Sequence, residues 1–231
     1  MNNNKNNIIC FKNNAVPAIQ YLGKEYPLNS CILMKVGSHG IESFSDILHR
    51  KEKENKNHGF MLWGYSGNLL NATETRKYFE SQKTLSKKFF IFMIETKSPF
   101  RNSPEKSKYF SIDRSTWYEL PEGLYTTGCD KAVICKNLNK TEFKFDLSKF
   151  LVASGASKGK NAGSYLKFRT DKACIEFSNS EIKKDPVFVT INWVAEILPP
   201  YTVYLSKNDI IQHNLFSTKI NKSRLGVFRN V

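Results

Sequence analysis

The sequence predicts an α/β protein with a mixed sheet, in which the first half follows a βαβαβ order and the second half is a β-rich meander. Up to residue 95, short apolar runs alternate with amphipathic stretches of helical period, an order typical of helices packed on a sheet. After residue 108, short β-like runs follow one another with turn residues between them. We therefore expect two halves of different character.

Three apolar runs predict the strands of the first half: 31–36, 59–65 and 88–95. Each is short and bounded by glycine or polar residues, as a buried strand requires. The third run, KFFIFMIE, is dense in aromatic and β-branched residues, which favours a central position in the sheet.

Two amphipathic stretches predict the helices between these strands. Four apolar residues share one helical face after the first strand: Ile41, Phe44, Ile47 and Leu48. Ser43 and Asp46 stand at capping-box spacing, and Asn71 with Glu74 repeats that spacing at the start of the second helix.

The second half is predicted to hold short strands separated by turns, at residues 109–112, 116–120, 131–135 and 142–147. Residues 187–205 are predicted to form two strands split at Pro199-Pro200. The segment 165–177 fits either a helix or a strand. We expect a disordered N-terminus over 1–14, a single domain over 15–205 with a soft sub-boundary near residue 103, and a basic C-terminal tail over 206–231.

The charge balance indicates a polyanionic partner. The net charge is +14, from 35 Lys and Arg against 21 Asp and Glu, and such an excess attracts nucleic acid first and an anionic membrane surface second. Only seven of the basic residues are Arg, and the chain carries 22 Asn. AT-rich codon usage would raise Lys and Asn together, so the excess also has an explanation without a function.

Cysteine use and hydropathy predict a cytoplasmic protein. The five cysteines form no CxxC pair and no zinc-binding spacing, which favours free thiols in a reducing compartment. The first residues, MNNNKNNIIC, lack the apolar segment of a signal peptide. No apolar run approaches the ~20 residues that cross a bilayer, so we expect no membrane span.

A glycine-bearing loop between the first strand and the first helix is the first candidate site. Its residues are Gly37, Ser38, His39 and Gly40. Backbone N–H groups at a helix N-terminus bind anions, and glycine lets a ligand approach closely. His39 is the residue of this loop that could act as an acid or base.

A second loop, at the end of the second strand, carries Trp63, Tyr65 and Ser66 around Gly64. Ligands of open α/β sheets bind beyond the carboxyl ends of strands. If the first two strands are parallel neighbours, both loops lie at one edge, and Trp63 and Tyr65 can stack on a base.

Glu95 and Lys97 follow the third strand, and the run FFIFMIETKS resembles the second half of the PD-(D/E)xK nuclease motif. In that family an apolar strand ends in a carboxylate and a lysine two residues apart, both on one face. The resemblance implies that Glu95 binds Mg²⁺ and that Lys97 helps to activate water. The preceding Asp of that family has no equivalent here, because no Asp occurs between Ile47 and Ile94.

A basic stretch supplies the candidate phosphate contacts Lys158, Lys160, Lys167 and Arg169. The loop GASKGK is similar to a phosphate-binding loop, but its glycines are one residue too close and Asn161 replaces the Ser or Thr of Walker A. These residues therefore predict a basic surface loop rather than a P-loop NTPase.

The leading prediction is binding of nucleic acid or a nucleotide-like anion through the two glycine-bearing loops and a Lys-rich surface. The alternatives are a Mg²⁺-dependent nuclease, a small-nucleotide enzyme or sensor, and a protein-interaction or anti-host factor. Whether the protein is an enzyme stays open. No cofactor is indicated, apart from Mg²⁺ under the nuclease alternative.

Overall fold

The computed structural model describes residues 9–10, 16–39, 42–86, 88–97, 105–166, 170–178, 185–207 and 220–221. The chain divides into two compact units. Unit 1 consists of Met1–Val36, Asn68–Thr96 and Leu138–Glu196, and unit 2 of Gly37–Gly67, Lys97–Asn137 and Ile197–Val231. The predicted single domain with a sub-boundary near residue 103 stays a prediction. Most of the predicted disordered N-terminus and basic tail falls outside the described residues.

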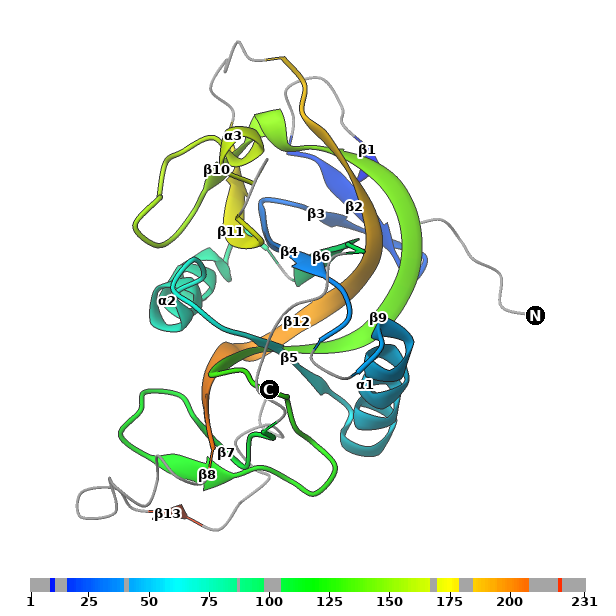
Figure 1. Ribbon diagram of the computed structural model, residues 1–231. Helices are drawn as coiled ribbons and strands as arrows, with labels where there is room; N and C mark the ends of the chain where they lie inside the picture. The colour runs from blue at the N-terminus through cyan, green and yellow to red at the C-terminus, as the bar shows by residue number, and fades with distance from the viewer. Residues whose placement is uncertain are drawn as a thin grey trace. The chain divides into compact units, whose positions relative to one another are not determined.

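The first half of the chain has the predicted βαβαβ order, and this confirms the fold class (Figure 1). Its elements are β4 (Ser30–Val36), α1 (Phe44–His58), β5 (Met61–Tyr65), α2 (Ala72–Gln82) and β6 (Phe89–Glu95). β4 is parallel to β6 and antiparallel to β11 (Lys172–Phe177), so the sheet is mixed.

The caps of both helices form from the residues that the spacing indicated. At α1, Ser43 accepts a hydrogen bond from the Asp46 amide, and the Asp46 carboxylate accepts one from the Ser43 amide, which completes a capping box. Gly59 ends α1 in the left-handed region at φ 77°. At α2, the Asn71 side chain accepts from the Glu74 amide. The Glu74 carboxylate binds elsewhere, at Gly155.

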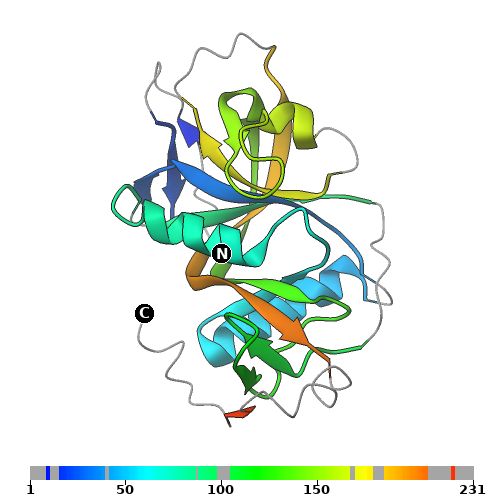
Figure 2. The same cartoon turned by 90° about the vertical axis from the view of Figure 1, so that its left-hand side faces the viewer.

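Unit 1 is built on the strand order β10-β11-β4-β6-β12. The elements of this unit not yet given are β1 (Ile9–Cys10), β2 (Ala18–Tyr21), β3 (Lys24–Pro27), the 3-10 turn η1 (Leu147–Lys149), β10 (Phe150–Val152) and α3 (Ala162–Leu166). β1, β2 and β3 form a separate antiparallel sheet. Helix α2, seen side-on in Figure 2, contacts β6 through Phe79 and Phe89, and its Tyr78 hydroxyl donates to the Glu176 carboxylate of β11 at 2.8 Å.

The core of unit 1 is aromatic. Phe90 and Phe92 of β6 pack with Phe145 and Phe150, and all four are fully buried. β6 stands between β4 and β12 in the strand order, as expected for a central strand. The dense aromatic run of the sequence therefore supplies the middle of this core.

Unit 2 contains β5, β7 (Tyr109–Ser111), β8 (Trp117–Glu119) and β13 (Ile220–Asn221), with α1 packed on β5. β5 pairs antiparallel with β9 (Lys131–Asp146), and β7 pairs antiparallel with both β8 and β12 (Phe188–Ser206). Leu62, Ile134 and Val203 lie at the centre of its core. The second half of the chain is strand-rich, as predicted.

Two predicted breaks in the second half are absent. Residues 131–147 were expected to hold two strands around a turn at 137–139, but β9 runs unbroken through Asn137, whose φ is 53°. β12 likewise continues through Pro199-Pro200, which are joined by a cis bond. Both strands have residues in both units. The turn-forming residues at these two positions predicted strand ends, but pairing with distant strands keeps each strand continuous.

The ambiguous segment 165–177 contains the end of helix α3 and the whole of strand β11. In the described part of the chain, no helix combines the length and the apolar character needed to span a membrane.

Candidate functional site

The Gly37 loop of unit 2 is closed by its own backbone. The His39 amide donates to the Glu42 carbonyl at 3.0 Å, and the Glu42 amide donates back to the His39 carbonyl at 3.0 Å. Gly37 is buried, Ser38 is half-buried, and Gly40 lies outside the described residues. The N-terminus of α1, which was expected to bind an anion, already holds the Asp46 carboxylate of the capping box.

His39 lies beside a buried network of charges. Burial is the largest effect on its pKa and lowers it, Glu42 opposes this shift, and Arg50 adds to it. Arg50 donates to both carboxylate oxygens of Glu42 at 2.9 Å and to Glu54 at 3.1 Å. These contacts pair the charges with one another.

Lys51 completes this network. Its ammonium donates to both oxygens of Glu54 at 2.8 Å and to the Tyr125 carbonyl at 3.1 Å. Glu54 is 1% exposed and also accepts from the Leu62 amide. Burial lowers the pKa of Lys51 to about 8, although Glu54 opposes the shift. The network links α1 to β5 and to the Tyr125 segment, as a structural ion cluster does.

The Trp63 loop is also packed by protein. Trp63 is 6% exposed and Tyr65 4%, whereas a base-stacking side chain needs an open ring face. A Cβ atom on Gly64 would lie 2.7 Å from the Thr126 Cβ and 2.9 Å from the Cys129 Sγ. The glycine is therefore needed for the close approach of the 126–129 segment.

Ser66, the last candidate of this loop, donates to the Gly128 carbonyl at 3.3 Å. β5 pairs with β9, whereas β4 pairs with β6 and β11. The two described strands β4 and β5 are therefore not parallel neighbours, although the predicted convergence of the two loops required this. The ligand-binding roles of both loops stay predictions.

Glu95 and Lys97 are exposed at the end of β6. The Glu95 amide donates to the Asn192 side-chain oxygen at 2.8 Å, and the Trp193 indole N–H donates to the Glu95 carboxylate at 3.4 Å. Across the described ranges, no group of three or more His, Cys, Asp or Glu side chains is placed to hold a metal ion. The nuclease alternative stays a prediction.

The loop 154–160 of unit 1 has a fixed backbone. The Gly155 amide donates to the Glu74 carboxylate at 2.7 Å, and the Ser154 hydroxyl lies 3.1 Å from that of Thr75. Three further amides bond to carbonyls: Lys158 to Gly155, Gly159 to Val152 and Lys160 to Ser157. Because these amides are already used, they cannot cradle a phosphate, and the side chains carry any anion contact.

Lys158 and Lys160 are both exposed on this loop, and neither forms an ion pair with a described residue. The other two predicted phosphate contacts, Lys167 and Arg169, lie outside the described residues. The carboxylate that contacts the loop, Glu74, is engaged with the backbone. The loop therefore carries, on a fixed backbone, two ammonium groups that no carboxylate in the described part of the chain neutralises.

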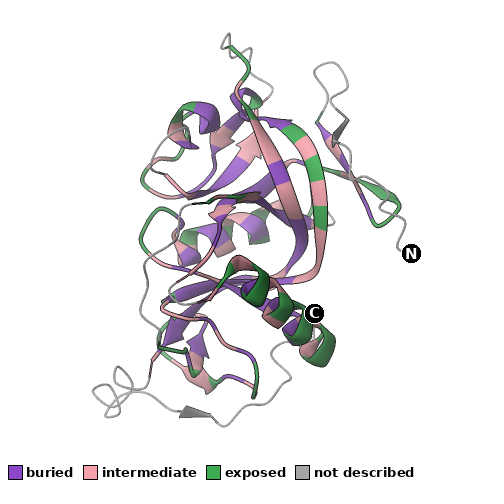
Figure 3. Ribbon diagram, turned by 45° about the vertical axis from the view of Figure 1, so that its right-hand side comes forward, coloured by how far each residue is buried: buried purple, intermediate pink, exposed green. Residues whose placement is uncertain are grey.

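Glu95 of β6 belongs to a group of side chains whose other members, on β9 and β12, were not predicted. The group consists of Glu95, Lys140, Glu142, Lys144, Thr190 and Trp193, which we call the outer patch. Along β9, exposed and half-buried residues alternate from Lys140 to Lys144 (Figure 3), so its exposed side chains share one face. Lys144 donates to the Thr190 hydroxyl at 2.9 Å. The alternation was present in the sequence, but the predicted turn at 137–139 obscured it.

Comparison of the chain with models of known protein families, with curated proteins and with solved structures finds no match to any of them.

Proposed function

We propose that the protein binds nucleic acid, and that Lys158 and Lys160 of unit 1 contact its phosphates. The observation that carries this proposal is the loop described above, whose backbone is fixed by Glu74 and whose two lysines lack an ion-pair partner among the described residues. Because the backbone that carries them is already ordered, binding costs the conformational entropy of the lysine side chains but adds no cost for ordering the loop.

The charge of the whole chain supports the same ligand class. A net charge of +14 raises the local concentration of any polyanion and speeds encounter. Some of the other lysines are neutralised, since Lys51, Lys88 and Lys172 are held by carboxylates. The 154–160 loop differs in carrying two exposed lysines, without an ion pair to a described residue, on a backbone that hydrogen bonds hold in place.

The test is the salt dependence of binding to a fluorescent single-stranded oligonucleotide, measured by anisotropy. Each phosphate neutralised contributes about 0.7 to the slope of log affinity against log salt for single strands. We expect the double variant Lys158→Gln/Lys160→Gln to bind more weakly at low salt and to lose about 1.4 from that slope.

The matched control is Lys83→Gln. Lys83 is exposed in the same unit, on the segment after α2, but it pairs with Glu80. This control is expected to keep the wild-type slope. Equal slopes for the double variant and the wild-type protein would remove the loop from the proposed interface, and an oligonucleotide that does not bind even at low salt would refute the function itself.

A further inference from the structure

The outer patch places a carboxylate against the edge of an aromatic ring. The Trp193 indole N–H donates to the Glu95 carboxylate at 3.4 Å. The adjacent Asn192 side chain accepts from the Glu95 amide at 2.8 Å, which fixes the end of β6 beside β12. Glu95 is exposed and Trp193 is half-buried. The contact therefore lies at the surface of unit 1.

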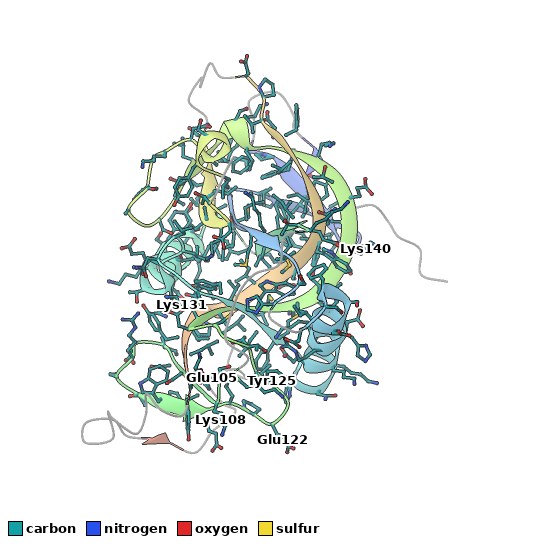
Figure 4. All side chains as sticks on the ribbon, viewed as in Figure 1. Glu105, Lys108, Glu122, Tyr125, Lys131 and Lys140 are labelled. Carbon is teal, nitrogen blue, oxygen red and sulfur yellow. The ribbon has the colours of Figure 1, made fainter. Side chains whose placement is uncertain are left out.

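Lysines flank this contact on β9. The Lys140 ammonium lies 5.9 Å from the centroid of the Trp193 ring, and Lys140, labelled in Figure 4, is exposed. Because a lysine side chain is long and flexible, it can leave the ring when a flat ligand stacks there. Lys144 is also exposed, and its partner is the neutral Thr190 hydroxyl.

The patch as a whole is electrically balanced. Two lysines, Lys140 and Lys144, stand against two carboxylates, Glu95 and Glu142. Such a surface has no net attraction for phosphate, in contrast to the 154–160 loop. What it offers is an aromatic ring for stacking and, next to it, acceptor oxygens that suit the N–H donors of a base edge.

The geometry points to a guanine-binding site at Trp193 and Glu95. This inference rests on the proposed function, since it takes the ligand to be single-stranded nucleic acid. Guanine carries two adjacent donors on its Watson–Crick edge, N1–H and the 2-amino group, which match the two oxygens of one carboxylate. Adenine, cytosine and uracil or thymine each place an acceptor beside the donor, and this acceptor repels the second carboxylate oxygen. A guanine stacked on Trp193 therefore has its edge beside the matching acceptor.

The experiment compares a short oligothymidylate with the same oligonucleotide carrying one central guanine, by anisotropy at a fixed salt concentration. We expect the guanine to raise affinity about fivefold, the lower end for a bidentate base contact. Inosine, which lacks the 2-amino donor, should lose most of this gain. 7-Deazaguanine keeps both donors and should retain it. Repeating the measurement with the RNA versions of both oligonucleotides shows whether RNA is preferred over DNA.

Glu95→Gln tests whether the Glu95 carboxylate binds the guanine, because the glutamine amide keeps the shape of the side chain but replaces one acceptor oxygen with a donor. It should remove the guanine preference while leaving affinity for oligothymidylate unchanged or slightly raised. Glu142→Gln, which changes the other carboxylate of the patch, should keep the preference. Binding of both oligonucleotides without preference, or a preference that survives Glu95→Gln, would overturn the guanine site and leave the proposed function standing. Failure of both to bind would overturn the proposed function and this site with it.

Discussion

The Glu74 carboxylate of α2 accepts a hydrogen bond from the Gly155 amide at 2.7 Å, across 81 positions of sequence. This contact joins the first turn of a helix to a loop with φ +86° at Gly155 and φ +83° at Gly159. It replaces the capping-box bond that the Asn71–Glu74 spacing predicts. The frame that presents Lys158 and Lys160 is thus held by a side chain from a distant helix.

Glu74→Ala should loosen this loop. Loss of an exposed, charge-assisted acceptor is expected to cost about 1 kcal/mol locally, which corresponds to about fivefold faster amide exchange. Hydrogen exchange followed by mass spectrometry on the peptide covering 153–160 measures it. Glu80→Ala is the control, since Glu80 is exposed on the same helix and pairs with Lys83. If both variants exchange like the wild type, Glu74 does not hold the loop.

Gly64→Ala should destabilise the protein. The added methyl group would meet Thr126 at 2.7 Å. The Thr126 segment cannot easily retreat, because the Thr126 amide donates to the Ser107 hydroxyl at 3.0 Å and its carbonyl accepts from the Ser107 amide at 2.9 Å. Overpacking of this kind costs about 1–3 kcal/mol. A urea midpoint equal to that of the wild type would show that the segment adapts freely.

Lys51→Met should be strongly destabilising. It leaves the Glu54 carboxylate, 1% exposed, with Arg50 as its remaining cation. Removing one partner of a buried ion pair costs about 3–5 kcal/mol, and the remaining Arg50 favours the lower end. Lys53→Met, an exposed position on the same helix, should change the unfolding free energy by less than about 0.5 kcal/mol. Similar losses in the two variants would argue against the network.

Alkaline pH should reduce stability through the buried thiols. Burial raises the pKa of Cys135 to about 12 and also raises the pKa of Cys31. In the unfolded chain these thiols ionise near pH 9, so between pH 9 and 12 the native state binds more protons and stability falls as pH rises. Lys51, with its pKa lowered to about 8, acts in the opposite direction. The contribution of Cys135 is fully present below pH 9.

Cys135→Ala isolates this effect. From pH 8 to pH 10 the wild-type protein should lose about 1.4 kcal/mol more than the variant, the value of one pKa unit. Urea unfolding under reducing conditions at the two pH values gives the difference. A variant whose stability declines as steeply as that of the wild type would rule out this assignment.

Local patterns were sufficient for the βαβαβ half. The Ser43–Asp46 capping box and the apolar runs depend on neighbours a few residues away, and they formed as predicted. The predictions for the second half were wrong where local sequence preferences and pairing with distant strands disagree. Asn137 signals a turn, but pairing with distant strands keeps β9 continuous.

The site residues were harder to predict for the same reason. Trp63 stands beside a glycine at the end of a strand, which is typical of a ligand loop, yet the residues that pack closely against Gly64 lie more than sixty positions later. Trp193 and Glu95 are 98 positions apart, and neither residue alone indicates the other. Lys158 and Lys160 could be proposed from composition, since exposed charge depends little on long-range packing.

Lysine footprinting with and without a single-stranded oligonucleotide tests the central claim most directly. Acetylation of each lysine is measured by mass spectrometry at saturating oligonucleotide. The proposed function predicts that Lys158 and Lys160 become several-fold less reactive, while Lys53 and Lys83 keep their reactivity. Unchanged reactivity of Lys158 and Lys160 at saturation would contradict it.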